Sequence, residues 1–452
     1  MGGGITDNYR QQESAARRGL HRSTRRIPWP IGTSRLASAA SPARRQPSCS
    51  TVAARCQVAS LSMADQTLRA QAVRHLRARR LLVVSAIVVL LFGVPWWTLL
   101  FAGTRWPTAV LVIGTLAFVA AVVALLMTMV WGHGRRHRDG AAVTGGVLLG
   151  AIWVLFVWSV LSQVLRLALL VFGVGDPARS RVVAATVVVV VVVLLVWGHF
   201  EAMRVPRVRL VDVTIPRLGA GMDGLRVAII TDTHYGPIDR AGWSAAMVER
   251  VNELDADVVC HLGDIADGTA DVREAQAAPL GRVRATYARV YVTGNHEYFS
   301  EAEGWLDFMQ GIGWETLRNR HVVVERGGDA LVIAGVDDVT AQGSGLEGHG
   351  ADVGAALMGA DPTLPVLLLA HQPKLVSHAV AAGVDLQLSG HTHGGQIWPF
   401  NFLVRLDQPV VHGLSRHSER TQLYTSRGSG FWGPPFRVFA PGELTLLTLR
   451  SV

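Results

Sequence analysis

Four long apolar segments constrain this chain more than any other feature of its sequence. They cover residues 81–102, 107–131, 141–161 and 182–198. A helix needs about 20 apolar residues to cross a bilayer. The last segment, mostly valine, is shorter and could in isolation be a buried strand, but a strand of that length would be unusual. Hydrophobic residues make up 50% of the chain and charged residues only 17%, which is typical of a protein with membrane-embedded segments. We therefore predict four transmembrane helices.

The stretch between the third and fourth segments leaves the number of spans open. Residues 161–174 are apolar but include Ser162, Gln163 and Arg166. They could extend the third helix, lie in the membrane interface or form a fifth span. The choice matters because four spans and five spans place the C-terminal half on opposite sides of the membrane.

Arginine clusters favour four spans, because cytoplasmic loops carry an excess of Lys and Arg. The clusters precede the first segment, follow the second and follow the fourth: Arg69, Arg74, Arg77, Arg79 and Arg80; Arg135, Arg136 and Arg138; Arg204, Arg207 and Arg209. We predict a multi-pass protein of the cell membrane with its C-terminal half on the cytoplasmic face, although Arg179 and Arg181 oppose this orientation. We attribute the net charge of +9 largely to these clusters, and so expect a lipid bilayer and no nucleic acid as partner.

Two flanking stretches have little apolar periodicity. Residues 1–80 are rich in Arg, Ser, Ala and Gln, and we expect them to be disordered. A transit peptide, or a true start at Met63, is an alternative. Residues 200–224 carry Pro206 and Pro216 and are predicted to form a linker.

From Leu225 to the end at Val452, short apolar runs alternate with helical stretches and glycine-rich turns, which predicts an α/β domain. Five of the apolar runs end in polar residues of one chemical kind. These residues are, in order, Asp232 and His234; Asp264 and Asp267; Asn295, His296 and Glu297; His371; and His391 and His393. Sites form where loops from several strand ends converge, so we expect these side chains to lie together.

The inventory of donors suits a pair of divalent metal ions. Imidazole, carboxylate and amide oxygen are ligands for borderline and hard cations, and no thiolate is offered. Two such ions and two aspartates leave a charge of +2, which a bridging hydroxide reduces to +1. That charge suits a phosphate-ester anion, and metal-bound water loses its proton near neutral pH. A single histidine at a strand end is more often structural, but the set predicts hydrolysis of a phosphate ester by a hydroxide that bridges two metals.

These five motifs, in this order, resemble those of the calcineurin-like metallophosphoesterase superfamily, over about Leu225 to Arg450. More narrowly, Gly394-Gly395-Gln396 and the later stretch from Ser426 to Arg437 resemble the bacterial YkuE/YaeI-type phosphoesterases and the group named "transmembrane protein with metallophosphoesterase domain". The resemblance implies a four-layer α/β/β/α fold, a β-sandwich flanked by helices, behind the multi-pass helical region. It also leads us to expect a bacterial protein.

The resemblance also implies a role for each residue of the site. The first metal would be bound by Asp232, His234, Asp264 and His393, and the second by Asp264, Asn295, His371 and His391. Asp264 would therefore bridge the two ions, of which manganese is favoured and iron or zinc would fit. His296 would be a general acid or stabilise charge, with Asp267 and Glu297 orienting ligands. Arg427 would contact the phosphate, or be a surface residue of a structural turn.

The predicted metal site and the predicted transmembrane helices lead to three hypotheses for function. The first is a membrane-anchored phosphodiesterase or pyrophosphatase, whose anchor favours a lipid-linked substrate. The second is a phosphomonoesterase acting on phosphoproteins or small phosphates. The third is a catalytically inactive membrane signalling or scaffold protein. Trp398 and Phe400 follow the Gly-Gly-Gln segment and are expected either to line the substrate mouth or to pack in the core.

Overall fold

The computed structural model describes residue 79 and residues 81–133 and 138–452. All of these belong to the compact unit from Ala78 to Val452. The predicted disorder of residues 1–80 therefore falls almost wholly outside the described residues, as do Arg135 and Arg136.

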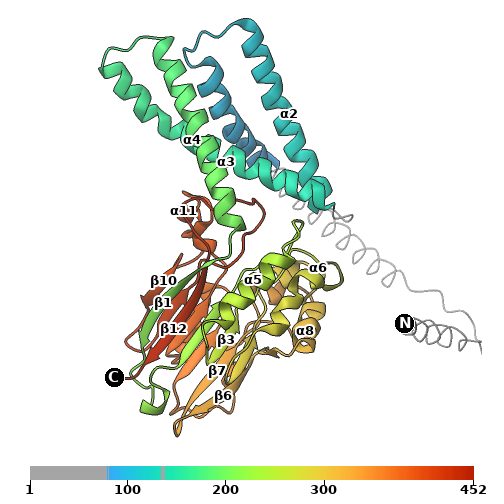
Figure 1. Ribbon diagram of the computed structural model, residues 1–452, viewed down its shortest axis with the longest axis vertical. Helices are drawn as coiled ribbons and strands as arrows, with labels where there is room; N and C mark the ends of the chain where they lie inside the picture. The colour runs from blue at the N-terminus through green and yellow to red at the C-terminus, as the bar shows by residue number, and fades with distance from the viewer. Residues whose placement is uncertain (1–78, 80, 134–137) are drawn as a thin grey trace, which may run out of the picture. The chain divides into compact units, whose positions relative to one another are not determined.

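Within the described residues, four helices are long and apolar enough to cross a membrane (Figure 1). They are Leu81–Phe101, which ends in a π-helical turn (η1, Trp97–Phe101), α2 (Thr108–His133), α3 (Asp139–Val171) and α4 (Ala178–Met203). The residues that left the number of spans open extend the third helix, since α3 continues to Val171. The prediction of four apolar helices is thus confirmed, and α3 and α4 are longer than the apolar runs alone indicate.

The rest of the chain forms two six-stranded sheets. The first has the order β1-β12-β2-β3-β4-β5 and the second β10-β11-β9-β8-β7-β6. The strands of the first sheet are β1 (Arg207–Thr214), β2 (Arg226–Ile230), β3 (Val258–His261), β4 (Ala288–Tyr291), β5 (Glu315–Thr316) and β12 (Glu443–Arg450). Those of the second are β6 (Arg320–Arg326), β7 (Asp329–Gly335), β8 (Val366–Leu369), β9 (Leu386–Ser389), β10 (Gly413–Arg416) and β11 (Gln422–Thr425). The central strands β2, β3 and β4 are parallel, as are β7, β8 and β9.

The predicted linker is not a linker throughout. Strand β1 lies inside residues 200–224 and pairs in parallel with β12, with Arg207 opposite Glu443. Its sequence alternates polar and apolar residues except at Leu210 and Val211, which is close to the pattern of a strand with one exposed face. The two prolines, Pro206 and Pro216, flank this strand rather than interrupt it.

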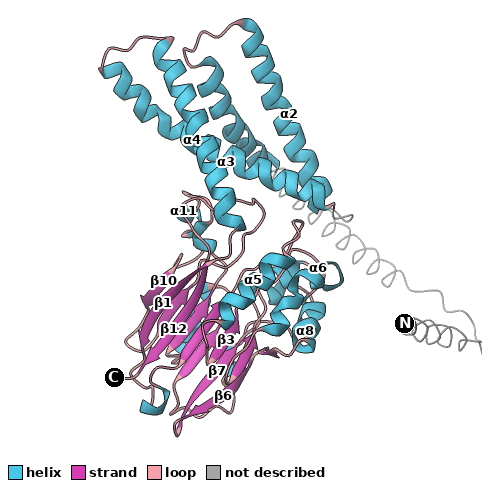
Figure 2. Ribbon diagram, viewed as in Figure 1, coloured by secondary structure: helices cyan, strands magenta, loops and turns pink. Residues whose placement is uncertain are grey.

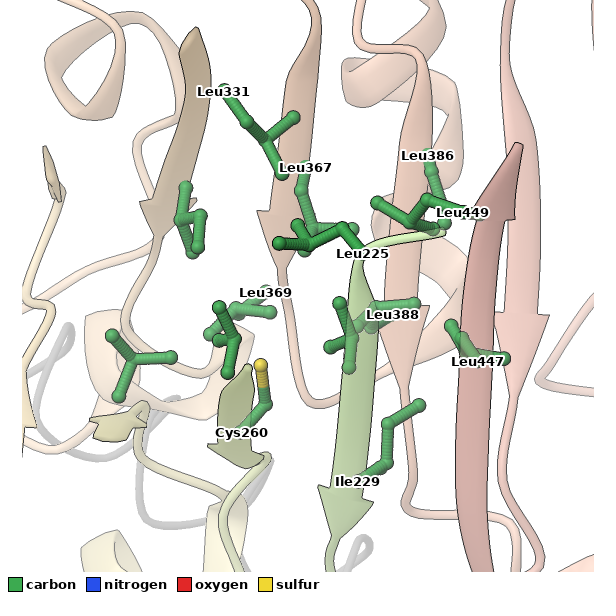
Figure 3. Close-up of a cluster of buried hydrophobic side chains, with 14 of the residues drawn as sticks. Leu225, Ile229, Cys260, Leu331, Leu367, Leu369, Leu386, Leu388, Leu447 and Leu449 are labelled. Carbon is green, nitrogen blue, oxygen red and sulfur yellow. The ribbon is translucent and has the colours of Figure 1, made fainter. Parts of the chain in front are cut away.

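The two sheets pack face to face, and apolar side chains from both fill the space between them (Figure 3). Ile229 and Cys260 come from the first sheet, and Leu367 and Leu388 from the second; all are at most 1% exposed. Alternate residues of a strand point to opposite faces, so Ile230 packs instead against the outer helices.

Helices cover the outer face of each sheet (Figure 2). Those over the first sheet are α5 (Ala241–Asn252), α6 (Ala270–Ala277) and α8 (Ala302–Gly311), and those over the second are α9 (Val353–Ala356) and α10 (Val376–Ala381). The four-layer α/β/β/α arrangement is therefore confirmed. Short helices that matter for the site are α7 (Asn295–Phe299), η4 (Val339–Gly343), η6 (His393–Gly395) and α11 (Asn401–Val404).

Helices α3 and α4 contact the sandwich directly. Trp153 of α3 donates a hydrogen bond from Nε1 to the carbonyl of Ile397 over 3.2 Å. The amide of Arg437 donates to the carbonyl of Gly198 in α4 over 2.9 Å. These contacts join the apolar helices to two loops, residues 396–400 and 430–440, that also lie beside the candidate site.

Candidate metal centre

The structure brings the seven predicted metal ligands together at the carboxyl ends of five strands. The first sheet contributes the loops after β2, β3 and β4, and the second sheet those after β8 and β9. Six of the seven side chains are buried, and His391 is partly exposed: the buried ones are Asp232, His234, Asp264, Asn295, His371 and His393. A site between the edges of two sheets explains why residues from positions 232 to 393 can meet.

One group of donors consists of Asp232, His234 and His393, whose donor atoms all lie within 4.8 Å of one another. The Nε2 atoms of His234 and His393 are 3.0 Å apart. Nε2 of His393 is also 3.3 Å from Oδ1 of Asp232. Three donors at such distances are spaced closely enough to bind a single ion.

The second group consists of Asp264, His371 and His391. Nε2 of His371 lies 3.2 Å from Oδ2 of Asp264 and 3.2 Å from Oδ1 of Asn295. The same Oδ2 atom of Asp264 is 3.5 Å from Nε2 of His234, in the first group. Asp264 therefore stands between the two groups, where a bridging ligand must stand.

Hydrogen bonds on the far side of two imidazoles leave their Nε2 atoms free for a metal. Nδ1 of His234 is 2.9 Å from Oδ1 of Asp267, and Nδ1 of His371 is 2.7 Å from the carbonyl of Leu262. These acceptors place the hydrogen on Nδ1, so the lone pair on Nε2 points inward. The donor set therefore fits a pair of divalent ions.

The electrostatics of the site also favour cations. Burial lowers the pKa of His391 to about 3, which keeps this imidazole neutral and able to bind a metal. Burial alone would lower the pKa of His371, but the charges of Asp264 and Asp232 raise it well above its usual value. The two carboxylates therefore favour positive charge beside His371, which a bound divalent ion can supply in place of a proton.

The backbone of the site is strained in a way that places the ligands. Five predicted ligands have left-handed φ angles, which are uncommon for residues other than glycine: Asp232 (54°), His234 (43°), Asp264 (53°), His391 (68°) and His393 (50°). The neighbouring Gly390 has no room for a side chain, because a Cβ there would lie 2.3 Å from Oδ2 of Asp232. Such strain persists only where the surrounding structure holds it.

Glu297 ties the loops after β3 and β4 together. Its carboxylate accepts hydrogen bonds from the amides of Asp264 (3.0 Å), Ile265 (2.7 Å) and Gly294 (2.5 Å). The side chain is fully buried. Burial and the nearby charge of Asp264 raise the pKa of Glu297 to about 7. This residue holds the backbone that presents Asp264 and does not face the donor groups itself.

His296 stands at the edge of the site, with its side chain 15% exposed. Its Nδ1 atom lies 2.7 Å from Oδ1 of Asp267. Burial lowers the pKa of His296, but the charges of Asp264 and Asp267 outweigh it and raise the pKa to about 9. The two carboxylates therefore favour the protonated form of the imidazole. Its ring also lies 5.4 Å from that of Phe299 and 5.9 Å from that of Trp432, measured between centroids.

Arg427 lies beside the site without a strong partner of its own. Its aliphatic part packs against Gly394, where a Cβ would lie 2.9 Å from Cγ of Arg427. Its Nη2 atom is 3.5 Å from Nδ1 of His412, and its Nε is buried without a hydrogen-bond partner. The predicted contact of Arg427 with phosphate stays a prediction.

A residue to which the sequence assigned no role, Arg437, is buried behind His393. Its guanidinium donates to the carbonyls of Gly430 (2.8 Å), Ala440 (2.9 Å) and His393 (3.2 Å). Burial lowers its pKa to about 10, so it stays charged at neutral pH. The only indication in the sequence was an arginine inside the apolar stretch Pro434–Ala440. Arg437 thus joins the last predicted ligand to the loop that contacts α4.

The chain is similar in sequence to known proteins. Residues 225–395 match the sequence model of the family described as calcineurin-like phosphoesterase. The chain is 36% identical over 264 residues to "Transmembrane protein with metallophosphoesterase domain" of Danio rerio, which covers 57% of this chain and 60% of that relative. It is 30% identical over 257 residues to an uncharacterized metallophosphoesterase of Aquifex aeolicus, covering 56% of this chain and 95% of that protein.

A third relative is the uncharacterized metallophosphoesterase YkuE of Bacillus subtilis, 28% identical over 239 residues, which cover 51% of this chain and 81% of YkuE. The chain spans about 60% of the length of its vertebrate relatives. Relatives occur in animals as well as bacteria, so the similarity does not support a bacterial origin in particular. Proteins of this kind hydrolyse phosphate esters and bind two divalent metals. On its sequence and its fold, the chain belongs to the calcineurin-like phosphoesterase family.

Proposed function

We propose that this protein is a membrane-anchored phosphoesterase that hydrolyses phosphodiester or pyrophosphate bonds, with a lipid-linked molecule as its substrate. One observation carries the proposal: two donor groups meet at a shared carboxylate. Oδ2 of Asp264 lies 3.5 Å from Nε2 of His234 in one group and 3.2 Å from Nε2 of His371 in the other. The lipid linkage is supported by the four apolar helices.

The two groups, completed by Asn295, would hold the pair of divalent ions. Bound there, the ions supply an activated water molecule and neutralise the charge of the phosphoryl group. Donors of imidazole and oxygen without thiolate fit manganese, iron or zinc, and of these we propose manganese.

His296 would supply the proton that the leaving group requires. Asp267 holds its Nδ1 atom at 2.7 Å, which leaves Nε2 for the substrate. A protonated imidazole there can donate to the leaving oxygen or stabilise charge on the phosphoryl group. Both roles require the positive charge that Asp264 and Asp267 maintain.

The test is a hydrolysis screen with the full-length protein in detergent micelles supplied with Mn²⁺, Fe²⁺ or Zn²⁺. Substrates are a nitrophenyl phosphate, its bis-nitrophenyl diester, and phosphodiester and pyrophosphate lipids. We expect diester or lipid hydrolysis that His296→Ala abolishes while the bound metal is retained. Asp264→Asn should lose both metal and activity. The matched control is His378→Ala, since this exposed histidine of α10 lies outside the site.

Two results would overturn the proposal. Faster hydrolysis of the monoester than of every diester and pyrophosphate would instead identify a phosphomonoesterase. Protein that contains no metal and hydrolyses none of these substrates would instead identify an inactive signalling or scaffold protein.

We also propose that the catalytic domain lies on the cytoplasmic face. Arg204, Arg207 and Arg209 follow α4 at the end that contacts the sandwich, and Arg138 precedes α3 at the same end. The opposite end carries Arg105, Arg179 and Arg181, so the excess is modest and rests partly on Arg135 and Arg136 in the sequence. We expect the domain to be protected from protease added to intact cells. Cleavage of the domain without permeabilisation would show that it lies on the outer face instead.

A further inference from the structure

The length of helix α4 predicts the level of the membrane boundary on the side of the catalytic domain. Its apolar segment, residues 182–198, has about the length that spans a bilayer and ends next to Trp197. Tryptophan is enriched at membrane–water interfaces, because its ring is largely apolar and its N–H is polar. The ring of Trp197 lies 5.6 Å from the ring of Phe439, a residue of the catalytic domain.

Helix α3 gives the same level independently. Counting about 20 residues back from its far end, Val171, reaches Ile152, next to Trp153. The ring of Trp153 lies 5.8 Å from the ring of Phe400, at right angles to it. Both helices therefore lead us to expect a tryptophan at the boundary, and each tryptophan lies against a phenylalanine of the catalytic domain.

The two phenylalanines belong to a larger exposed apolar surface on α11 and the loops beside it. We name it the α11 surface; its members and exposed fractions are Phe400 (40%), Phe402 (56%), Leu403 (48%), Leu406 (84%) and Phe439 (56%). Phe439 adopts a φ of 59°, which is rare for a bulky residue and must be held by its surroundings. Figure 1 draws α11 beside the domain-side end of α4, as the ring contacts require. Such a surface would be costly to leave in water.

The α11 surface is also close to the metal centre. Only Gly394, Gly395 and Gln396 separate His393 from Ile397, whose carbonyl binds Trp153. Four residues span at most about 14 Å. The side-chain amide of Gln396 makes two hydrogen bonds with the backbone of Trp432. It accepts one from the N–H of Trp432 over 2.9 Å and donates one to the carbonyl of Trp432 over 2.8 Å. Trp432, 49% exposed, stands against His296 at the edge of the site.

We propose that the α11 surface lies in the interfacial layer of the bilayer and holds the edge of the metal centre at the membrane. The substrate is then an amphiphilic phosphate ester whose apolar chain stays in the bilayer while its phosphate reaches His296 and the metals. This second part rests on the proposed hydrolase function, whereas the position of the surface does not. Arg405, which lies exposed between Leu403 and Leu406, can extend to the lipid phosphates from the same surface.

The position of the surface is tested by fluorescence quenching in vesicles. Cys49 and Cys56 are replaced by Ser, Cys260 is left because it is buried, and an environment-sensitive fluorophore is attached to Leu406→Cys or Phe402→Cys. The full-length protein is reconstituted into phosphatidylcholine–phosphatidylglycerol vesicles containing lipids with a nitroxide near the headgroup. The matched control is Met358→Cys, since Met358 is 77% exposed but follows α9, which packs on β6 and β7 at the other edge of the second sheet.

We expect nitroxide lipids to quench the labels at positions 406 and 402 at least threefold more strongly than the label at 358. Equal quenching at the three positions would overturn the proposal. A blue-shifted label at 406 that nitroxide lipids do not quench would also overturn it, and would identify a second copy of the chain or another protein as the partner of this surface.

The substrate class is tested separately with Leu403→Ser/Leu406→Ser. Two values of kcat/KM are measured, one for a long-chain phosphate ester in vesicles and one for a soluble diester. In this variant the ratio of the first to the second should fall about tenfold, mainly through a higher KM for the long-chain ester. The same ratio should stay unchanged for Met358→Ser. An unchanged ratio in the double variant would refute delivery from the membrane. Absence of all hydrolysis would refute the hydrolase function and leave the quenching result standing.

Discussion

The carboxylate of Asp267 lies between His296 and His234: its Oδ1 atom is 2.7 Å from Nδ1 of His296 and 2.9 Å from Nδ1 of His234. One acidic group therefore orients both a predicted metal ligand and the predicted proton donor. Although burial opposes ionisation, the two imidazoles hold the pKa of Asp267 far below its usual value. Asp267 thus stays negative over the whole range in which a hydrolase works.

Removal of that charge should move the pH profile of hydrolysis. The pKa of His296 is raised to about 9, in part by Asp267. Bound metals lower this value, and Asp267→Asn should lower it further. Because the protonated form is the one that donates, activity is lost as pH rises through this pKa. We expect the alkaline limb of the kcat profile to shift by one or more pH units toward acid.

The measurement is kcat between pH 5 and pH 10 at constant bound metal. Asp271→Asn, at an acidic residue in the first turn of α6, serves as the control. An alkaline limb that does not move in Asp267→Asn would mean that His296 is not the group that titrates.

Glu297→Gln should destabilise the fold through the loops after β3 and β4. The carboxylate accepts from three amides, whereas a glutamine offers one oxygen and turns an NH₂ group toward backbone donors. We expect a loss of about 2 kcal/mol in the free energy of unfolding. It would appear as a lower thermal midpoint of the full-length protein in detergent. Glu325→Gln, on an exposed position of β6, should leave the midpoint unchanged.

Much of the geometry of the candidate metal centre could be predicted from the sequence, because the predicted ligands directly follow buried strands. Asp232, Asp264 and His371 each come one or a few residues after an apolar run, and each is where the motif order implies. The apolar helices were equally visible, since a spanning helix needs no partner to be recognised.

The parts that could not be predicted depend on contacts between distant segments. The sequence predicts a linker where β1 lies, because the partner of β1 is β12, more than 220 residues later in the chain. Arg437 had no assigned role because its acceptors belong to residues 393, 430 and 440, which only the folded loop brings together. A buried arginine can be identified only from the groups that accept its hydrogen bonds in the folded protein. The residues next to it in the sequence do not show which groups these are.

Arg437→Lys should weaken metal binding while the charge is kept. The guanidinium holds carbonyls of His393, Gly430 and Ala440 in several directions at once, and a lysine ammonium cannot reproduce that geometry. Loss of such an orienting partner typically weakens metal affinity about 10- to 100-fold. Titration of metal into the chelator-treated protein would measure this change. Arg416→Lys is the control, because the exposed side chain of Arg416 donates to the carbonyl of Glu419, far from the donor groups. An equal effect there would refute the role of Arg437.

Helix α3 packs closely against the loop that carries Trp432. A Cβ at Gly146 would lie 2.8 Å from the carbonyl oxygen of Gly433, closer than carbon and oxygen atoms pack. Gly146→Ala should therefore push α3 and this loop apart, and with them the ring of Trp432 beside His296. We expect a lower thermal midpoint and at least threefold slower hydrolysis with bound metal unchanged.

Gly140→Ala provides a matched control on the same helix, because a Cβ there meets nothing within 4 Å. Alanine is the better helix former, so this change should be neutral or slightly stabilising. If both variants behaved alike, the packing of α3 against the loop would not matter for the site. If only Gly146→Ala slowed hydrolysis, the transmembrane helices would do more than anchor the enzyme, since one of them would hold the edge of the metal centre in place.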